Sequence, residues 1–333
     1  MPELLVGVRR VIVLLGGGSS EREISLRSGR AVTCALASLG YAVRPLDPLE
    51  ESVERFRWQL GDFAFIALHG RFGEDGQVQT ILERRGVPYT GSGPTASRLA
   101  FSKSAAKEEF RRHDVPTPRG VVVPAAGSPG EWRSLADSVG YPLVVKPDQE
   151  GSSLGVSFVG AADGLIAACE RAFSFGPVAL FEEAIVGSEW TVGLLDDRPL
   201  PPLKVTVPGQ IFDFDDKYAR ETTEYDFDGG VAPGERDRIG TLAARAAGSL
   251  GVTGLSRVDI RVDRSGSPFV LEVNTVPGLT DHSLIPKAAQ RAGWTLGTLC
   301  EETMRLALQR ASVPQIASSP YDWLPDVADR RAG

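Results

Sequence analysis

Cysteine is scarce in this chain of 333 residues, and the positions of the three cysteines limit what they can do. Cys34, Cys169 and Cys300 lie far apart, and the sequence has no CxxC pair. This pattern supports neither a disulfide framework nor a zinc site, and it fits the reducing conditions of the cytoplasm. We therefore expect a cytoplasmic protein.

Long hydrophobic runs and an excess of basic charge are also missing. The apolar run 11–15 is too short for the core of a signal peptide or for a membrane span. A formal net charge of -7 argues against bulk binding to nucleic acid or to an anionic membrane surface. We expect small-molecule partners, with no nucleic acid and no membrane, and the length predicts two or three domains.

Strand and helix patterns alternate in residues 1–92, which we interpret as the first domain. A buried strand at 11–15 ends in Gly16-Gly17-Gly18, and a helix is predicted over 23–39. Further strands are predicted at 42–45, 63–68 and 87–89. Apolar strands that alternate with helices indicate βαβ units and a parallel sheet.

The rest of the chain is predicted to form two more domains and a tail. The second domain, 93–181, has a helix at 102–112, strands at 143–146 and 156–159, and a helix at 163–172. The third domain, 182–312, has a long polar loop that reaches residue 234, a strongly periodic helix at 239–250, a β-hairpin and a last helix at 283–292. Residues 313–333 lose all periodicity and form a tail of unknown role.

The predicted hairpin carries the most informative polar residues. Segments 256–262 and 269–273 both read as strands with side chains that alternate between two faces. A two-residue turn at Ser265-Gly266 would place Asp259 directly opposite Glu272. Two facing carboxylates destabilise a β-ladder unless a cation lies between them.

The same register pairs Arg257 with Asn274 and Val262 with Phe269. Its apolar face is predicted to hold Val258, Ile260, Val262, Phe269, Leu271 and Val273. Carboxylate and amide oxygens are hard ligands that suit Mg²⁺. The other interpretation is a solvated polar face on which Arg257 neutralises one acid, and the hairpin alone does not decide between the two.

Small residues follow a lysine at the end of another predicted strand. Lys146 ends the strand 143–146, and Gly151 begins the loop 151–155 (GSSLG). Such a loop lets backbone N–H groups approach phosphate oxygens, and the lysine adds positive charge. The spacing is not that of a Walker A motif, and an ordinary β-turn is the alternative.

Polar residues also lie at the ends of strands in the first domain. Gly16-Gly17-Gly18 lacks the GxGxxG spacing, so it is either a nucleotide loop or a tight strand-to-helix turn. Glu21 either complements the helix macrodipole or receives a substrate ammonium group. His69 ends a strand, where ligands bind in open α/β sheets.

The polar segment 212–224, which holds Lys217 and Tyr218, is long enough to act as a lid. A surface loop without a function is the alternative. No serine or cysteine lies in a nucleophile pattern such as GxSxG, so covalent catalysis by such a residue is not indicated.

Taken in order, these segments resemble the D-alanine–D-alanine ligase family of the ATP-grasp superfamily. The resemblance spans about residues 11–311. It rests on LLGGGSSEREISL (14–26), ALHGRFGEDG (67–76), PYTGSG (88–93), VVKPDQEGSSLGVS (144–157), DDKYA (215–219), RVDIRV (257–262) and LEVNTVPGLTDHSLIP (271–286). So many long strings in one order are highly specific.

The resemblance implies an α/β, Rossmann-like domain at 1–92, followed by an α+β ATP-grasp fold of two subdomains at 93–181 and 182–312. It implies ATP and two Mg²⁺ ions, which Mn²⁺ could replace, and a homodimer. In the implied reaction one D-alanine carboxylate is phosphorylated, and the amine of a second D-alanine attacks the acyl phosphate. The dipeptide is a precursor of peptidoglycan.

Site residues follow from the matching motifs. Nucleotide binding is implied for Lys103, Lys146, Gly151, Ser152, Ser153, Glu182, Glu183, Ile185, Glu189 and Lys217. Metal binding is implied for Asp259, Glu272 and Asn274. Catalytic roles are implied for Glu21, Ser152 and Tyr218, which would form a triad, and for Arg257 and the Gly278 N–H, which would form an oxyanion hole. Substrate contacts are implied for Glu21, His69, Lys217, Ser283 and Leu284.

The chain departs from the usual family pattern at 226–233 (DFDGGVAP) and in the tail. The first departure bears on the lid and on the choice of second substrate. Tyr218 stands where related depsipeptide-forming ligases carry histidine, which favours an amine nucleophile. The alternatives are an ATP-grasp ligase for another amino acid or small acid, a nicotinamide oxidoreductase that uses Gly16-Gly17-Gly18, and a silent nucleotide-binding regulator.

Overall fold

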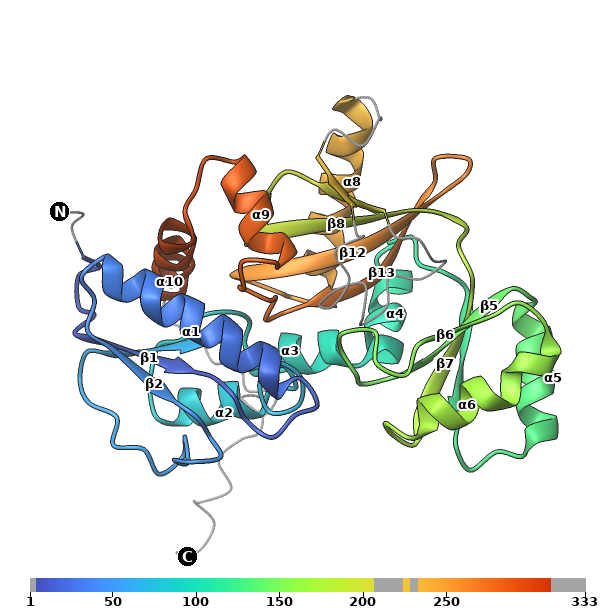
Figure 1. Ribbon diagram of the computed structural model, residues 1–333, viewed down its shortest axis with the longest axis horizontal. Coiled ribbons are helices and arrows are strands. Elements are labelled where there is room, and N and C mark those ends of the chain that lie inside the picture. Colours follow the sequence, from blue (N-terminus) through green and yellow to red (C-terminus); the bar gives the residue numbers. More distant parts are fainter. Residues whose placement is uncertain (1–3, 207–223, 228–232, 313–333) are drawn as a thin grey trace, which may run out of the picture.

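The computed structural model describes residues 4–206, 224–227 and 233–312. At one end of the elongated molecule lies a parallel sheet in the order β2-β1-β3 (Figure 1). Its strands are β1 (Arg10–Leu14), β2 (Val43–Leu46) and β3 (Asp62–Ile66). The prediction of a parallel sheet is confirmed, although the predicted strand at 87–89 contributes only a single parallel bridge, from Tyr89 to Ala64.

Both faces of this sheet are covered, because its central strand is apolar and buried from Val11 to Leu14. Val11 and Val13 belong to the core on one side, whereas Ile12 and Leu14 belong to the core on the other. Helix α1 (Arg22–Ser38) covers the first side together with α10 (Leu296–Ser312), and α2 (Gln77–Arg84) covers the second. Strands buried on both faces are typical of parallel sheets.

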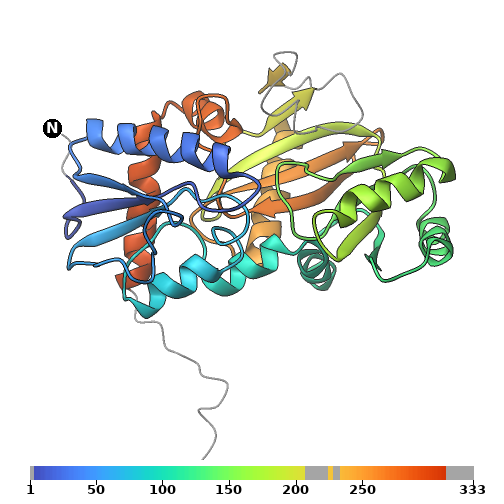
Figure 2. The same ribbon diagram turned by 60° about the horizontal axis from the view of Figure 1, so that its bottom comes forward.

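A four-stranded antiparallel sheet lies at the opposite end, in the order β4-β7-β5-β6 (Figures 1 and 2). Its strands are β4 (Gly120–Pro124), β5 (Leu143–Pro147), β6 (Ser157–Val159) and β7 (Val178–Glu183). Its outer face is packed by α5 (Pro129–Val139) and α6 (Leu165–Phe173), and the short helix η1 (Ala162–Gly164) leads directly into α6. Helices α3 (Pro94–Phe101) and α4 (Lys103–Arg112) connect this end to the parallel sheet.

A larger antiparallel sheet occupies the middle of the molecule, with the path β11-β10-β8-β12-β13 and β9 beside β8. Its strands are β8 (Gly187–Leu195), β9 (Arg198–Pro199), β10 (Leu203–Thr206), β11 (Glu224–Asp226), β12 (Leu255–Asp263) and β13 (Pro268–Asn274). Helix α8 (Pro233–Ser249) packs on one face through the predicted apolar stripe, and α9 (Leu284–Arg291) lies near β8.

The hairpin of β12 and β13 has the predicted pairing at its functional end only. Asp259 faces Glu272 and Arg257 faces Asn274, as predicted. Beyond a bulge next to Asp259 the register shifts by one residue, so Val262 pairs with Pro268. The predicted partner Phe269 is therefore wrong.

The predicted apolar face of the hairpin is confirmed for Val258, Ile260, Val262 and Val273, which are buried in the core. The register shift makes the prediction wrong for its other two residues. Val270 is fully buried in the core, whereas Phe269 and Leu271 are only half-buried. The turn is longer than the predicted two residues, because Asp263 N–H donates to the Ser267 carbonyl at 2.9 Å around Gly266, whose φ is +85°. A three-residue loop of this kind uses glycine at the left-handed position.

Several elements lie where the sequence did not predict them. The predicted last helix at 283–292 is followed by α10, which buries Leu299, Cys300 and Met304 against α1. Strand β11 interrupts the predicted polar loop. Apart from Glu224, which begins β11, the lid segment lies outside the described residues, including Lys217 and Tyr218.

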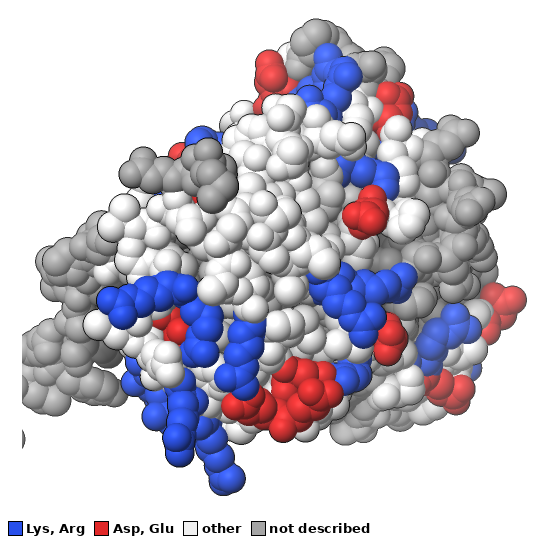
Figure 3. Space-filling model, turned by 60° about the vertical axis from the view of Figure 1, so that its left-hand side comes forward, with Lys and Arg blue, Asp and Glu red and all other residues white. Residues whose placement is uncertain are grey.

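On the face at the parallel-sheet end, acidic and basic side chains lie among one another beside a broad uncharged area (Figure 3). Among the described residues, this face is therefore not uniformly basic. No described helix combines the length and the apolar character needed to cross a membrane.

Candidate active site

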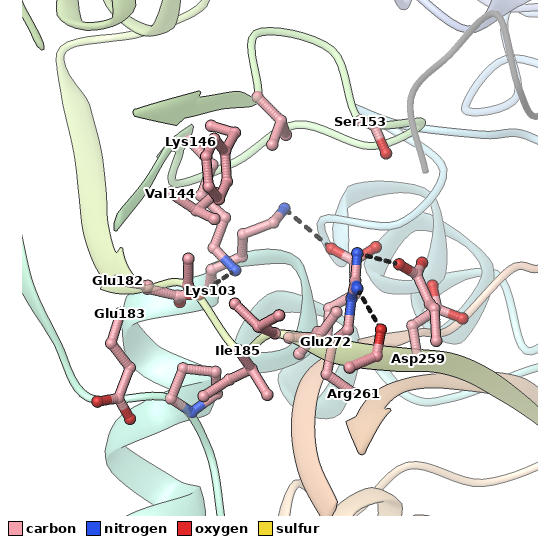
Figure 4. Close-up of a pocket in the computed structure, with 18 of the residues that line it drawn as sticks. Lys103, Val144, Lys146, Ser153, Glu182, Glu183, Ile185, Asp259, Arg261 and Glu272 are labelled. Carbon is pink, nitrogen blue, oxygen red and sulfur yellow. Dashed lines mark hydrogen bonds and ion pairs between the residues drawn. The ribbon is translucent and has the colours of Figure 1, made fainter. Parts of the chain in front are cut away.

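A cavity of about 540 Å³ lies between the two antiparallel sheets (Figure 4). The four-stranded sheet contributes Lys146 and Glu182, and the larger sheet contributes Glu189, Asp259 and Glu272. This size is within the range that holds small ligands and cofactors. Residues more than a hundred positions apart thus line one space.

Two lysines project into the cavity from different elements (Figure 4). Lys103 begins α4, and its Nζ lies 3.3 Å from Glu272 Oε2 and 2.5 Å from the backbone oxygen of Glu150. Lys146 lies in β5, and its Nζ is 2.7 Å from Glu182 Oε2. Both lysine side chains are almost buried, so solvent screens the attraction between their ammonium groups and a nearby anion only weakly.

The segment that joins the two sheets lines one side of the cavity. Ile185 lines it together with the neighbouring acids Glu182 and Glu183. The Glu183 carboxylate pairs with Arg119 at 3.0 Å, whereas Glu182 pairs with Lys146. Only Glu182 of these two acids is thus tied to a cavity lysine.

Arginines accompany the acids on the larger sheet. Glu189 pairs with Arg261 at 3.1 Å. Arg257 donates from Nε and Nη2 to the two oxygens of Asp259, at 2.9 and 2.8 Å. Thr191 Oγ1 donates to the same carboxylate at 2.7 Å. The paired arginine that the sequence suggested for one acid is therefore present.

The donor set at the end of the hairpin fits a hard divalent cation. Asp259 and Glu272 face each other across the ladder, and Asn274 Nδ2 lies 3.3 Å from Asp259 Oδ2. Two carboxylates and an amide oxygen are ligands that Mg²⁺ accepts. Within the described residues no group of three or more His, Cys, Asp or Glu side chains could hold a metal. Any metal would therefore depend on the amide and on substrate oxygens as well.

The glycine loop reaches across to the parallel sheet. Ser152 and Ser153 have φ of +50° and +58°, a conformation that non-glycine residues rarely adopt. Ser152 Oγ donates to Glu21 Oε1. A Cβ at Gly151 would lie 2.5 Å from Glu21 Oε2, so only glycine lets the loop approach this closely.

Glu21 itself precedes α1 and makes no side-chain cap bond to it. Its carboxylate points instead toward the glycine loop and toward Gly70, where a Cβ would lie 3.0 Å from Glu21 Oε2. The carboxylate of Glu21 thus lies where the glycine loop meets the parallel-sheet end of the molecule.

His69 is buried at the carboxyl end of the parallel sheet. Its Nε2 lies 3.1 Å from Ser28 Oγ, which also accepts the Leu279 N–H at 3.2 Å. Burial lowers the pKa of His69 to about 4, against a backbone hydrogen bond with Val276 that raises it. The ring is therefore neutral at pH 7, and it links the parallel sheet to the chain after β13.

That chain after β13 also holds Gly278, Ser283 and Leu284. A Cβ at Gly278 would lie 2.8 Å from Ser283 Oγ, so the two residues are in close contact. Ser283 Oγ accepts the Thr280 N–H at 3.0 Å. The Leu284 side chain packs into a small core with Leu203 and Val205, which leaves its backbone at the start of α9 as the part that can face a ligand.

Several charged residues at the site received no role from the sequence, and three of them are Glu74, Arg261 and Lys107. Glu74 is buried, and its oxygens accept the N–H groups of Gly70 at 2.6 Å and Val276 at 3.3 Å. Burial and the nearby charge of Glu21 raise the pKa of Glu74 to about 8. Arg261 lines the cavity. Lys107 does not line it but forms an ion pair with Glu182, which does.

A signal for two of them was present in the sequence. Glu74 lies in the same string as His69, and Lys107 lies one helical turn after Lys103.

A small neighbouring cavity shares Lys103 and Glu272 with the large one. It is also lined by Glu74, Gly151 and Asn274. The lysine-lined space is thus next to the contact between the glycine loop and the parallel sheet. Of the residues predicted from the motifs, nine line the larger cavity: Lys103, Lys146, Ser153, Glu182, Glu183, Ile185, Glu189, Asp259 and Glu272.

Two antiparallel sheets that enclose a lysine-lined cavity, next to a parallel-sheet domain, define a ligase of the ATP-grasp class. The model of the D-ala D-ala ligase C-terminus matches residues 114–305, and that of the N-terminus matches residues 47–92. The chain belongs to the D-alanine–D-alanine ligase family.

Individual relatives agree with this assignment. A D-alanine–D-alanine ligase of Stutzerimonas stutzeri is 43% identical over 284 residues, which cover 85% of this chain and 90% of that one. The crystal structure of a Bacillus anthracis D-alanine–D-alanine ligase complexed with ATP has a TM-score of 0.77 at 30% identity, and the match covers 91% of this chain and 99% of that one. The VanG D-Ala:D-Ser ligase of Enterococcus faecalis has a TM-score of 0.78 at 26% identity, covering 90% and 99%.

Proposed function

We propose that this protein joins two D-alanine molecules at the expense of ATP, and so supplies the dipeptide for peptidoglycan synthesis in the cytoplasm. One observation carries the proposal. The lysine-lined cavity shares Lys103 and Glu272 with the smaller space beside Gly151, which touches the buried carboxylate of Glu21. A nucleotide in the first space can therefore place its terminal phosphate beside an amino acid held at Glu21.

Nucleotide binding is assigned to the cavity residues. The ammonium groups of Lys103 and Lys146 are suited to phosphate oxygens, and backbone N–H groups of Gly151, Ser152 and Ser153 can approach closely. The base would lie against the segment from Glu182 through Glu183 to Ile185. Glu189, at the other side of the cavity, is assigned to the ribose hydroxyl groups.

The metal site is assigned to Asp259, Glu272 and Asn274. These residues would hold two Mg²⁺ ions, or Mn²⁺ in their place, which would supply positive charge to offset the charge that develops during phosphoryl transfer. Binding of cations at this position would also remove the repulsion between the two facing carboxylates. Lys103 offsets Glu272 in the present arrangement.

The first D-alanine is assigned to Glu21, with its ammonium on that carboxylate and His69 nearby. A D-alanine carboxylate oxygen attacks the γ-phosphorus, the bond to ADP breaks and an acyl phosphate forms. The nitrogen of the second D-alanine then attacks the carbonyl carbon, loses a proton and expels phosphate. Ser152, Glu21 and Tyr218 are assigned to a triad that closes this site, with Tyr218 supplied by the lid.

Stabilisation of the negative charge on the tetrahedral intermediate is assigned to Arg257 and the Gly278 N–H. Each such donor is worth about 3–4 kcal/mol in known enzymes. The second D-alanine would place its carboxylate at Ser283, at the backbone of Leu284 and at Lys217. The start of α9 favours an anion because its first N–H groups point outward.

The direct test is a substrate panel in a phosphate-release assay with ATP and Mg²⁺. D-Alanine is expected to give the fastest release, with the dipeptide identified by mass spectrometry, and omission of either D-alanine or Mg²⁺ is expected to stop it. Phosphate release without D-alanyl-D-alanine would contradict the proposal.

A second candidate is ligation of D-alanine to another nucleophile. It is favoured by the structural match to a D-Ala:D-Ser ligase and by the unusual segment at 226–233. A competition between D-alanine and D-serine, with both products measured, decides between them.

The three domains are assigned to residues 1–92, 93–181 and 182–312, and the homodimer is a proposal from the resemblance. Sedimentation velocity tests the dimer.

A further inference from the structure

Lys107 is a buried cation that has no place in the chemistry assigned above. It lies one turn after Lys103 on α4, and only 2% of its side chain is exposed. Its Nζ donates to Thr117 Oγ1 at 2.9 Å and to the Pro118 carbonyl at 2.6 Å, and it lies 3.0 Å from Glu182 Oε1. Two hydrogen bonds and one ion pair thus hold the ammonium group.

Glu182 lies between Lys107 and the cavity. Its side chain is 3% exposed, one oxygen faces Lys107, and the other lies 2.7 Å from Lys146 Nζ. Lys146 and Glu182 line the cavity, whereas Lys107 does not. The three side chains therefore form a buried row with the charges plus, minus, plus. The charges of both lysines lower the pKa of the Glu182 carboxyl group, so it remains ionised at neutral pH.

The row has a consequence for the cavity lysine. A buried carboxylate without a counter-ion is strongly unfavourable. If Lys146 were the only counter-ion of Glu182, its ammonium group would have to remain paired with that carboxylate. Lys107 supplies a second positive charge to Glu182 on the side of the carboxylate away from the cavity.

We infer that Lys107 is a positioning residue for nucleotide binding: it neutralises Glu182 and so allows Lys146 to direct its charge to nucleotide phosphates. This inference rests on the proposed function, because it needs phosphates in the cavity. The same ammonium holds Thr117 and Pro118, and Thr117 Oγ1 donates to the Val270 carbonyl at 2.9 Å. Lys107 thereby also fixes the cavity wall, because Pro118 lines it.

The test compares two ligands that differ in phosphate. Binding of ADP with Mg²⁺ and binding of adenosine are measured by calorimetry for the full-length protein and for Lys107→Met. The variant is expected to bind ADP about 10- to 100-fold more weakly, since Lys146 stays on Glu182, and adenosine within about threefold of the wild type. Arg112→Met is the matched control. It removes a charge from the same helix, where Arg112 is 60% exposed in surface pairs, and should change neither affinity.

A double variant separates this role from general stability. In Glu182→Gln the carboxylate is absent, so adding Lys107→Met should leave the ratio of ADP to adenosine affinity unchanged. This pair of variants has no unpaired buried carboxylate, so it also serves if Lys107→Met alone does not fold. An equal loss of ADP and adenosine in Lys107→Met, or a further fall of the ratio in the double variant, would overturn the inference. If the wild type binds no ADP, the proposed function itself fails.

Discussion

Removal of Arg257 should reduce turnover far more than it reduces substrate binding. Arg257→Met deletes a guanidinium that makes two hydrogen bonds to Asp259, and the two side chains are 14% and 10% exposed. If the same group stabilises the oxyanion, its loss costs about 3–4 kcal/mol in the transition state. That corresponds to a fall in kcat of about 10²- to 10³-fold.

The assay must separate this effect from a loss of stability. Leaving Asp259 without its arginine also costs about 3 kcal/mol of folding stability, as for other broken buried pairs. Initial rates of phosphate release are therefore measured well below the unfolding midpoint of the variant, with ATP and D-alanine varied in turn.

Arg261 offers a matched control on the same strand. Its side chain is also 14% exposed and pairs with Glu189, but it lines the nucleotide cavity. Arg261→Met should raise the KM for ATP and leave kcat within about threefold, since a uniform binding contact is lost. An Arg257→Met variant with full turnover, or one in which only the KM for ATP changes, would refute the oxyanion assignment.

Three further predictions follow from buried groups near Glu21. His69 has a pKa of about 4 in the folded protein and near 6.5 in the unfolded chain, so the free energy of unfolding should fall by about 3 kcal/mol as pH drops from 6.5 to 4. In chemical unfolding, His69→Gln should lose most of this dependence of stability on pH. An unchanged dependence would exclude His69 as its source. Glu74 has the opposite sign: its pKa of about 8 lies above the unfolded value of 4.5, so its contribution is present below pH 4.5 and is lost as pH rises to 8. Glu74→Gln should therefore gain stability relative to the wild type between pH 5 and 8, and a constant difference would contradict this. Gly151→Ala would place a Cβ 2.5 Å from Glu21 Oε2 and should raise the KM for D-alanine at least about tenfold. Gly248→Ala is the control: it lies in a helix with no atom near the new Cβ, so the variant should be active and more stable by about 0.5–1 kcal/mol. Equal kinetics for both alanine variants would argue against close packing at Glu21.

The hairpin illustrates what local pattern can and cannot determine. Asp259 and Glu272 pair as predicted, yet the predicted turn was one residue too short. The bulge at Leu271 shifts the register back by one residue, so the two deviations cancel at the functional end. A bulge has no clear signature in alternating apolar residues, so the pairing near the turn was not predictable from them.

Helix α10 was missed although its apolar residues do recur with a helical spacing. Leu299, Cys300, Met304 and Ala307 are buried against the first domain. This segment follows 283–292 closely in the sequence and packs against α1, which is far away in the chain. The spacing of the apolar residues predicts the helix but not the helix against which it packs.

The residues of the candidate site likewise fall into those that the sequence predicted and those that it did not. Lys146 and the hairpin acids were identified because each lies in a distinctive string. Glu74 and Lys107 owe their burial to long-range contacts, with Val276 and Glu182 respectively, and no local pattern shows such contacts. Their positions close to His69 and Lys103 were a signal, but their burial was not predictable, because most glutamates and lysines are exposed.

The central claim is that a D-alanine carboxylate is activated as an acyl phosphate within the cavity. The most direct measurement follows oxygen: D-alanine labelled with ¹⁸O in its carboxylate is incubated with ATP and Mg²⁺, and the released phosphate is analysed by mass spectrometry. We expect one ¹⁸O in each phosphate released, together with D-alanyl-D-alanine that has lost one label from its first residue. Unlabelled phosphate would show that ATP is hydrolysed by water, and it would contradict the account.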